Sequence, residues 1–348
     1  MTTYLLDLNP DELAAFLAER GEPPYRARQI SSWIYRRLAR SFEEMTDLPL
    51  GLRSRLSEEA IIGRLQPVRD LRSSDAHTRK WLLALPDGAR IETVLMGYEK
   101  RSTACISTQA GCGMECVFCA TGRMGLQRNL SAGEIVEQVL YVARELDLLE
   151  GGPGLSNIVI MGMGEPFANY SNTMKAVRCL IDPSRYGMGA RHITISTVGL
   201  IPGIRQFSKE GIQVNLAISL HAATDDLRDR LVPINQTYPL DKLMRGVRDY
   251  LDRTRRRVSF EWALIGGVND TVEQARELVQ LVRGLLCHIN LIPLNPVEGY
   301  AHSASPQRAV SAFRDVLDRA GIPNTVRLRR GIDIQAGCGQ LFARSEIG

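Results

Sequence analysis

Residues 131–148, SAGEIVEQVLYVARELDL, and residues 157–163, NIVIMGM, carry the helix-then-strand pattern that decides the fold. Ser131 is followed three residues later by Glu134, and this capping-box spacing predicts a helix over residues 132–148. The apolar run at residues 157–163 predicts a buried strand. A helix followed by a buried strand is the repeating unit of a parallel α/β sheet.

The same alternation continues toward the C-terminus. Further expected helices cover residues 172–181, 240–253, 271–286 and 306–320. Further expected strands cover residues 104–107, 192–197, 213–220, 258–265, 289–294 and 325–328. This order predicts an α/β fold in which a parallel sheet bends into a full or partial (β/α) barrel. Functional residues of such barrels lie where strands end and loops begin.

The chain before the barrel has a different pattern. Asn9, followed by Pro10, Asp11 and Glu12, has the features of a helix start. Two more helices are expected at residues 26–38 and 50–60. Strand-like runs at 80–85 and 91–96 flank a Pro-Asp-Gly turn, which predicts a hairpin. We therefore expect an N-terminal helical accessory domain at residues 1–65, a linking β-hairpin at 66–97 and a core domain at 98–348.

Composition excludes some classes of protein. The 348 residues are 44% hydrophobic, which suffices for a large core with a small module attached. No run of 18 apolar residues occurs, and the first residues resemble no secretory signal, so we expect a cytoplasmic protein without a membrane span. The net charge is +4, and the basic residues are almost all arginine. Arginine suits phosphate and base stacking, although codon bias would give the same excess.

The segment GCGMECVFCATG, residues 111–122, contains three of the seven cysteines. Cys112, Cys116 and Cys119 could bind three irons of a 4Fe–4S cluster and leave the fourth iron open, whereas most clusters have four cysteine ligands. A structural zinc site is the alternative. Zinc wants four ligands, and no histidine or further cysteine follows Cys119 within a dozen residues. A fourth ligand would have to come from Cys105 or from a distant residue.

This motif resembles that of the radical S-adenosylmethionine superfamily, and its surroundings are similar to the RNA adenine methyltransferases of the RlmN and Cfr family. The matching stretches follow the family's order across nearly the whole core. They are CISTQAGC (105–112), CATG (119–122), RNLSAGEI (128–135), MGMGEP (161–166), ISTVG (195–199), SLHA (219–222), LIPLNP (291–296) and DIQAGCGQL (333–341).

The resemblance implies that S-adenosylmethionine binds the open iron of the cluster. The residues that match the family's cofactor pocket are Gly164, Glu165, Ser196, Ser219, Leu220, His221 and Asn295. Several of them lie at predicted strand ends, where a barrel places its site. Ordinary polar capping of strand ends would explain Ser196, Ser219 or Asn295 taken singly. His221 could equally be a satisfied buried histidine.

The resemblance also implies catalytic roles for Cys338, Cys105 and Glu92. In the family, the residue matching Cys338 takes a methyl group from one S-adenosylmethionine, and a 5′-deoxyadenosyl radical from a second converts it to a carbon radical that adds to the base. The residue matching Cys105 then attacks the Cys338 sulfur, which leaves a disulfide to be reduced. The residue matching Glu92 accepts a proton. Buried structural thiols and an exposed strand glutamate are the ordinary alternatives.

We therefore expect a radical S-adenosylmethionine methyltransferase that acts on carbon 2 of adenine in large-subunit rRNA and in tRNA next to the anticodon. Methylation at carbon 8 uses the same cysteines and stays open, as does a non-catalytic iron–sulfur RNA-binding protein or redox sensor. We expect a monomer with an electron donor such as flavodoxin or ferredoxin. Cys179 and Cys287, in apolar helical stretches, are expected to pack in the core. Two groups of arginines could bind RNA phosphates, or could simply belong to solvated helix faces. They are Arg20, Arg26, Arg28, Arg36, Arg37 and Arg40, and Arg253, Arg255, Arg256 and Arg257.

Overall fold

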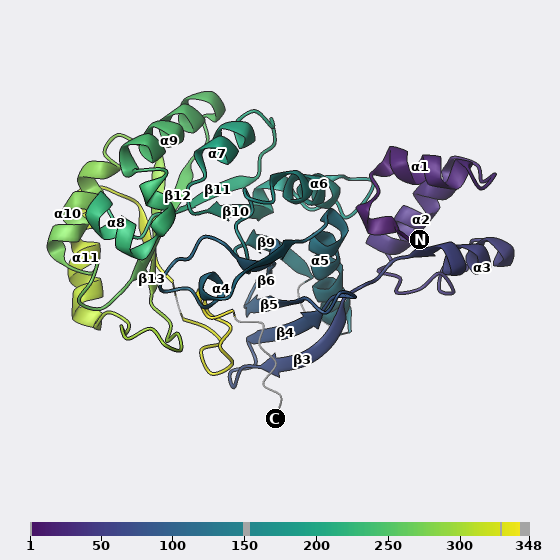
Figure 1. The fold of residues 1–348 in the computed structure, drawn as a ribbon, viewed down its shortest axis with the longest axis horizontal. Coiled ribbons are helices and arrows are strands. Elements are labelled where there is room, and N and C mark those ends of the chain that lie inside the picture. The colour runs from purple at the N-terminus through teal and green to yellow at the C-terminus, as the bar shows by residue number, and fades with distance from the viewer. Residues whose placement is uncertain (1, 149–153, 328, 342–348) are drawn as a thin grey trace.

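A computed structural model describes residues 2–148, 154–327 and 329–341. In these residues ten strands form one curved sheet, most of the helices cover the sheet, and three N-terminal helices form a group at one end of the molecule (Figure 1). A search of the same residues found no helix that is both long and apolar enough to span a membrane.

Neighbouring strands in the larger part of this sheet run parallel and follow one another in chain order. They are β6 (Arg101–Cys105), β9 (Leu155–Ile160), β10 (Ile193–Thr197), β11 (Asn215–Ser219), β12 (Val258–Leu264), β13 (Cys287–Pro293) and β14 (Asn324–Val326). The described edge strands β14 and β3 do not pair with each other, so the barrel is partial. The predicted α/β partial barrel is confirmed.

Helices connect these strands. They are α5 (Ala132–Asp147), α6 (Tyr170–Ile181), α7 (Ile201–Phe207), α8 (Asp225–Leu231), α9 (Leu240–Thr254), α10 (Val272–Leu281) and α11 (Gln307–Arg319). The predicted capping box of α5 is present, because the Ser131 hydroxyl accepts from the Glu134 N–H at 3.2 Å and the Glu134 carboxylate accepts from the Ser131 N–H at 2.9 Å. The short helices α7 and α8 were not predicted.

The expected helix at residues 271–286 is wrong at its end. Helix α10 ends at Leu281, and Gly284 adopts a φ of +75° in the turn that follows. Since a left-handed residue cannot continue an α-helix, the chain turns there and β13 begins at Cys287. Cys287 is therefore a buried strand residue and not a helical one. In the expected strand at 325–328, Leu328 lies outside the described residues.

The expected hairpin is present, but it extends the main sheet. Strands β3 (Gln66–Arg72), β4 (Thr78–Ala84) and β5 (Arg90–Tyr98) pair antiparallel, and β5 then pairs antiparallel with β6. Their register places Lys80 opposite Val94 and Val94 opposite Cys105. Because side chains alternate along a strand, Lys80, Glu92 and Cys105 share one face of the sheet. The domain boundaries at residues 65 and 97 stay a prediction.

The N-terminal group packs on α5. It contains α1 (Pro10–Ala18), α2 (Tyr25–Tyr35), α3 (Leu50–Glu59) and the paired short strands β1 (Thr3–Tyr4) and β2 (Ala60–Ile61). The predicted start of α1 is confirmed by a capping box at Asn9. The buried carboxylate of Glu137 on α5 accepts hydrogen bonds from the Tyr4 hydroxyl and from the backbone N–H groups of Arg64 and Leu65. A buried carboxylate needs such partners, so this contact fixes the group on the core.

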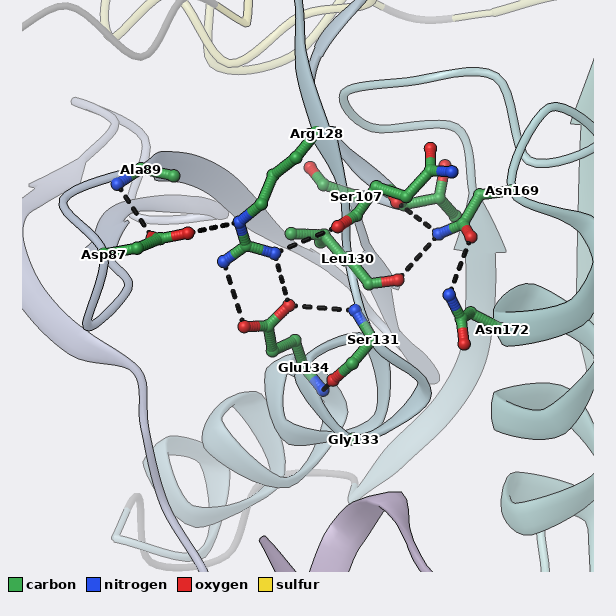
Figure 2. A network of polar contacts seen from close by, with 12 residues as sticks. Asp87, Ala89, Ser107, Arg128, Leu130, Ser131, Gly133, Glu134, Asn169 and Asn172 are labelled. Carbon is green, nitrogen blue, oxygen red and sulfur yellow. Dashed lines mark hydrogen bonds and ion pairs between the residues drawn. The ribbon is translucent and has the colours of Figure 1, made fainter. Parts of the chain in front are cut away.

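The loop that holds the three motif cysteines is closed at its base. Strands β7 (Gln109–Cys112) and β8 (Gly125–Asn129) pair antiparallel, and α4 (Ala120–Arg123) lies between them in the chain. Figure 2 shows how the base is tied down: Arg128 contacts both carboxylate oxygens of Glu134, at 2.8 and 3.0 Å, and also Asp87 in the β4–β5 turn. Paired contacts of this kind are geometrically specific.

Gly111→Ala tests this closure. Gly111 has a φ of +76°, and an added Cβ would lie 1.9 Å from the Gly125 carbonyl oxygen. Left-handed strain and overpacking together should lower the free energy of unfolding by on the order of 2–4 kcal/mol, measured by urea denaturation. Gly113→Ala is the matched control, since its Cβ would meet only the Leu126 Cβ at 3.6 Å. Equal stability of the two variants would contradict the close approach.

Candidate functional site

Two adjoining cavities are lined by most of the predicted site residues. The first, which we call the cofactor pocket, is lined by the three motif cysteines and by Gly164, Glu165, Ser196, Ser219, His221 and Asn295. The second, which we call the thiol cavity, has a volume of about 620 Å³ and is lined by Cys105 and Arg327 among others. Cys338 lines both cavities. Leu220 is fully buried beside the cofactor pocket and does not line it.

The three motif cysteines come from the end of β7, the loop after it and the residue that precedes α4. Burial raises the pKa of the Cys112 thiol to about 12, and it also raises the pKa values of Cys116 and Cys119. The protein alone therefore leaves these thiols protonated, and a bound metal would be the agent that deprotonates them.

The arrangement of these thiols bears on the choice between a cluster and zinc. Among the described residues, no three His, Cys, Asp or Glu side chains converge on one metal-ion position. A structural zinc site normally has four protein ligands. A 4Fe–4S cluster with one open iron has three cysteine ligands. The three motif cysteines, which line one pocket, match the donor set of such a cluster.

Glu165 follows β9 and is 2% exposed. Its carboxylate accepts hydrogen bonds at 2.9 Å from the backbone N–H groups of Phe167 and Val198. Burial raises the pKa of Glu165 to about 7, against the opposing effect of these bonds. The preceding Gly164 has a φ of +101°, and an added Cβ would lie 2.6 Å from the Gln109 Cβ. A tight glycine turn thus places an acceptor carboxylate in the wall of the cofactor pocket.

Three polar side chains complete this wall. Ser196 on β10 and Ser219 on β11 have hydroxyl oxygens 3.2 Å apart. Asn295 follows β13, and its Nδ2 donates to the Cys338 carbonyl at 3.1 Å. The Asn295 Oδ1 is buried and has no hydrogen-bond partner within the described residues. The hydroxyl groups of Ser196 and Ser219 are within hydrogen-bond distance of each other on neighbouring strands. The two side chains therefore form a direct contact and do not only cap separate strand ends.

His221 is a satisfied buried histidine that also lines the cofactor pocket. Its Nδ1 accepts from the Ala263 N–H at 2.9 Å, and its ring lies edge-on to Phe118 with centroids 4.8 Å apart. Burial, assisted by the charge of Arg228, lowers the pKa of His221 to about 3. The ring is therefore neutral near pH 7 and acts as an acceptor and a packing surface.

The loop that carries Cys338 is attached to α4. The Gly339 carbonyl accepts from the Ala120 N–H at 2.7 Å, and the Leu341 carbonyl accepts from the Thr121 hydroxyl at 2.6 Å. Ala120 directly follows Cys119, so these bonds hold Cys338 beside the motif cysteines. Cys338 is an exposed residue that lines both cavities.

Cys105 and Cys338 lie close enough to influence each other. Burial raises the pKa of Cys105 to about 12, with a further contribution from the charge of Cys338. Enclosure by the surrounding protein also raises the pKa of Cys338, whereas the Arg327 guanidinium lowers the pKa values of both thiols. Arg327 follows β14 and was missed in the sequence, where no motif marks it. Every one of the seven cysteines is a free thiol.

Glu92 is buried, at 4% exposure, but it does not belong to the described lining of either cavity. Its carboxylate forms an ion pair of 2.8 Å with Lys80, and Lys80 also donates to the Gln335 carbonyl at 3.1 Å. Gln335 lies three residues before Cys338. Glu92 is therefore linked to the Cys338 loop through Lys80, a residue that sequence reasoning did not single out.

The candidate RNA-binding arginines differ in their surroundings. In the N-terminal group, Arg20 pairs with Glu59, Arg26 with Glu22 and Arg40 with Glu145, and Arg36 donates to the Pro183 carbonyl. Arg253, Arg255, Arg256 and Arg257 instead line a surface cavity. Cys179 is buried in α6, and its expected packing role is confirmed.

A partial parallel barrel with three cysteines in the loop after its first strand defines a class. The model of the Radical SAM superfamily matches residues 106–281, and the model of the ribosomal RNA large subunit methyltransferase N-terminal domain matches residues 3–62. A crystal structure of a radical SAM methyltransferase from Sphaerobacter thermophilus has a TM-score of 0.96 and 49% identity, and it covers 98% of this chain and 100% of its own.

Full-length relatives narrow the class. A probable dual-specificity RNA methyltransferase RlmN from Chloroflexus aurantiacus is 50% identical over 99% of this chain and 93% of its own length. Dual-specificity RNA methyltransferase RlmN 1 from Myxococcus xanthus is 51% identical over 98% of this chain and 95% of its own length. The chain therefore belongs to the RlmN family of radical S-adenosylmethionine RNA methyltransferases.

His221 predicts a pH dependence of stability. Its folded pKa of about 3 lies below the unfolded value near 6.5, so the unfolded chain binds more protons as the pH falls below about 6.5. Stability should therefore fall on acidification, with a contribution from His221 on the order of 2 kcal/mol by about pH 5. The free energy of unfolding can be measured by urea denaturation at several pH values from neutral to acidic. Plotted against pH, it should fall less steeply for His221→Asn than for the wild type. His302→Asn, at an exposed position, should keep the wild-type slope. Identical slopes for all three proteins would contradict the assignment.

Proposed function

We propose that this protein methylates carbon 2 of adenine in large-subunit rRNA and in tRNA next to the anticodon, with a methylated Cys338 as the intermediate. One observation carries the proposal: Cys338 lies in the wall shared by the cofactor pocket and the thiol cavity, and Cys105 lies in the second of these. A thiol in that position can exchange groups with molecules on either side. The two relatives are dual-specificity RNA methyltransferases by name, which supports an RNA substrate.

The residues of the cofactor pocket fit its expected occupants. Cys112, Cys116 and Cys119 would hold a 4Fe–4S cluster, and Gly164, Glu165, Ser196, Ser219, Leu220, His221 and Asn295 would surround S-adenosylmethionine. When bound, this pair supplies a methyl group and, after one-electron reduction, a radical that abstracts hydrogen. Glu165 offers a carboxylate, and Asn295 an unpaired carbonyl oxygen, to the polar groups of the ligand.

Cys338 is suited to carry a methyl group between the two cavities. Cys338 is an exposed residue that lines both cavities. Enclosure raises the pKa of its thiol, and the Arg327 guanidinium opposes that rise and so favours the nucleophilic thiolate. Gly337 and Gly339 flank it, and Gly339 has a φ of +82°. The hydrogen bonds to α4 limit the movement of the loop to the neighbourhood of Cys119.

Cys105 has the position of the resolving thiol. Once a methylene joins the Cys338 sulfur to the adenine carbon, the Cys105 thiolate can attack that sulfur. The sulfur–sulfur bond forms while the sulfur–carbon bond breaks, and the released carbon takes a proton to become the methyl group. Arg327 favours the Cys105 thiolate that this attack needs. The resulting disulfide requires reduction before the next turnover.

Glu92 is proposed as the acceptor of the proton that leaves the base carbon. Lys80 pairs with its carboxylate and donates to the Gln335 carbonyl, so a shift of the Cys338 loop would also move Lys80.

We further infer a monomer that acts in the cytoplasm with a small electron-transfer protein, such as flavodoxin or ferredoxin. Methylation at carbon 8 is the second candidate, because it would use the same cysteines.

Nucleoside mass spectrometry tests the proposed reaction. The anaerobically reconstituted protein, given S-adenosylmethionine, a reductant and unmodified rRNA or tRNA fragments, should produce 2-methyladenosine. Cys338→Ala should yield no product while it keeps its iron, because the methyl carrier is lost and the cluster ligands are untouched. A product of 8-methyladenosine would favour the second candidate, and absence of any methylated adenosine would contradict both.

Cys105→Ala separates a resolving thiol from a cluster ligand. We expect the variant to retain about as much iron as the wild type and to accumulate a covalent RNA adduct on Cys338, visible as a nuclease-sensitive band shift on a denaturing gel. The double variant Cys105→Ala with Cys338→Ala should form no adduct. Cys116→Ala is the comparison for a true ligand and should lose the cluster. An iron-free Cys105→Ala protein, or one that still turns over, would overturn the role given to Cys105.

A further inference from the structure

A second cavity on the surface lies away from the cofactor pocket. It has a volume of about 790 Å³, and we call it the arginine groove. It lies at the amino-terminal ends of β10, β11 and β12, beside the C-terminus of α9. Among the described residues that line it, none is acidic and five are arginines: Arg191, Arg253, Arg255, Arg256 and Arg257.

The charge of the arginine groove is not neutralised within the described residues. None of its five arginines takes part in an ion pair there. This differs from the N-terminal group, where Arg20, Arg26 and Arg40 each pair with a glutamate. Five like charges around one hollow repel one another unless an anion joins them.

Hydrogen bonds to neighbouring residues hold two of the arginines of the groove in defined positions. The Arg256 guanidinium donates to the Gln213 carbonyl at 2.8 Å and to the Asn215 side-chain oxygen at 3.0 Å, and Arg191 donates to the Gln213 side chain at 2.8 Å. The Arg256 Nε is buried and makes no hydrogen bond within the described residues. These bonds fix two of the arginines, while Arg253, Arg255 and Arg257 are exposed.

The arginine groove and the thiol cavity share one lining residue. Thr194, at the start of β10, lines both. The thiol cavity is itself basic, since its lining includes Arg101, Arg327, Arg329 and Arg330. Arg101 and Arg330 stack on the ring of Tyr98, with 4.3 and 4.6 Å to its centroid. Arginines therefore line both the cavity that holds Cys105 and Cys338 and the groove that shares Thr194 with it.

We propose that the arginine groove binds the phosphate backbone of the substrate RNA, outside the nucleotide that enters the thiol cavity. The inference rests on the proposed function for its substrate class. Arginine forks match phosphate oxygens, and a group of arginines without ion pairs next to the thiol cavity suits a polyanion that spans several phosphates. In Figure 1 the N-terminal helices lie on the far side of β9 and β10 from α9, so the groove provides a contact distinct from that module.

The test replaces together the three arginines that the hydrogen bonds of the groove do not fix, as Arg253→Gln, Arg255→Gln and Arg257→Gln, and leaves Arg256 and Arg191 in place. RNA affinity should fall roughly tenfold or more near physiological salt, and the slope of log affinity against log salt should become shallower by about 2. The KM for RNA should rise while kcat at saturating RNA is kept. The matched control is Arg276→Gln, Arg283→Gln and Arg308→Gln, exposed arginines that line neither cavity.

Further measurements separate this inference from the proposed function. Methylation of Cys338 without RNA, measured by peptide mass spectrometry, should be the same in the triple variant and the wild type. If the protein makes no methylated adenosine but its RNA binding still depends on the groove, the proposed function is contradicted and the inference about the groove is supported. Equal RNA affinity and salt slope in the triple variant and the control would overturn the inference. Inorganic phosphate that stabilises the wild type but not the triple variant, with RNA binding unchanged, would assign the groove to a small anion and overturn it as well.

Discussion

The close approach of Gly111 to Gly125 is the constraint on which the site depends. It brings the two ends of the cysteine loop together, so that Cys112, Cys116 and Cys119 project from a closed segment. Closing a loop of this size costs chain entropy, and the backbone pairing of β7 with β8 offsets part of it. Arg128 then joins that base to α5 and to the β4–β5 turn. The loop is thereby positioned by three separate parts of the fold.

A second consequence follows from the attachment of the Cys338 loop to α4. Because α4 begins directly after Cys119, any shift of the motif loop is transmitted to the segment that carries Cys338. All five cysteines of the site have raised pKa values, so the protein alone keeps them as thiols. The two groups of cysteines differ in the positive charge that can stabilise their thiolates. Metal would deprotonate the three motif cysteines, and Arg327 favours the thiolates of Cys105 and Cys338.

The sequence predicted those parts of the molecule that depend on local spacing. The start of α1, the capping box of α5 and the order of the parallel strands follow from short-range patterns. The grouping of Glu165, Ser196 and Ser219 in one pocket was implied by the family resemblance. Lys80 and Arg327 could not be predicted in the same way. Lys80 reaches Gln335 only because β4 belongs to the main sheet, and Arg327 follows a three-residue strand without any motif. Contacts between distant segments decide both roles.

The arginines show most clearly what a composition cannot resolve. An excess of arginine over lysine fits RNA binding and codon bias equally well, and both groups of arginines look alike as strings of basic residues. Folding distinguishes them. Acidic partners from α3, α5 and the loop before α2 reach the N-terminal arginines, whereas no carboxylate in the described part of the chain pairs with the arginines of the groove beside α9. An arginine already paired with glutamate gains less from a phosphate, since the new contact must replace an existing one. The capacity to bind a polyanion therefore depends on the distribution of the carboxylates as much as on that of the arginines.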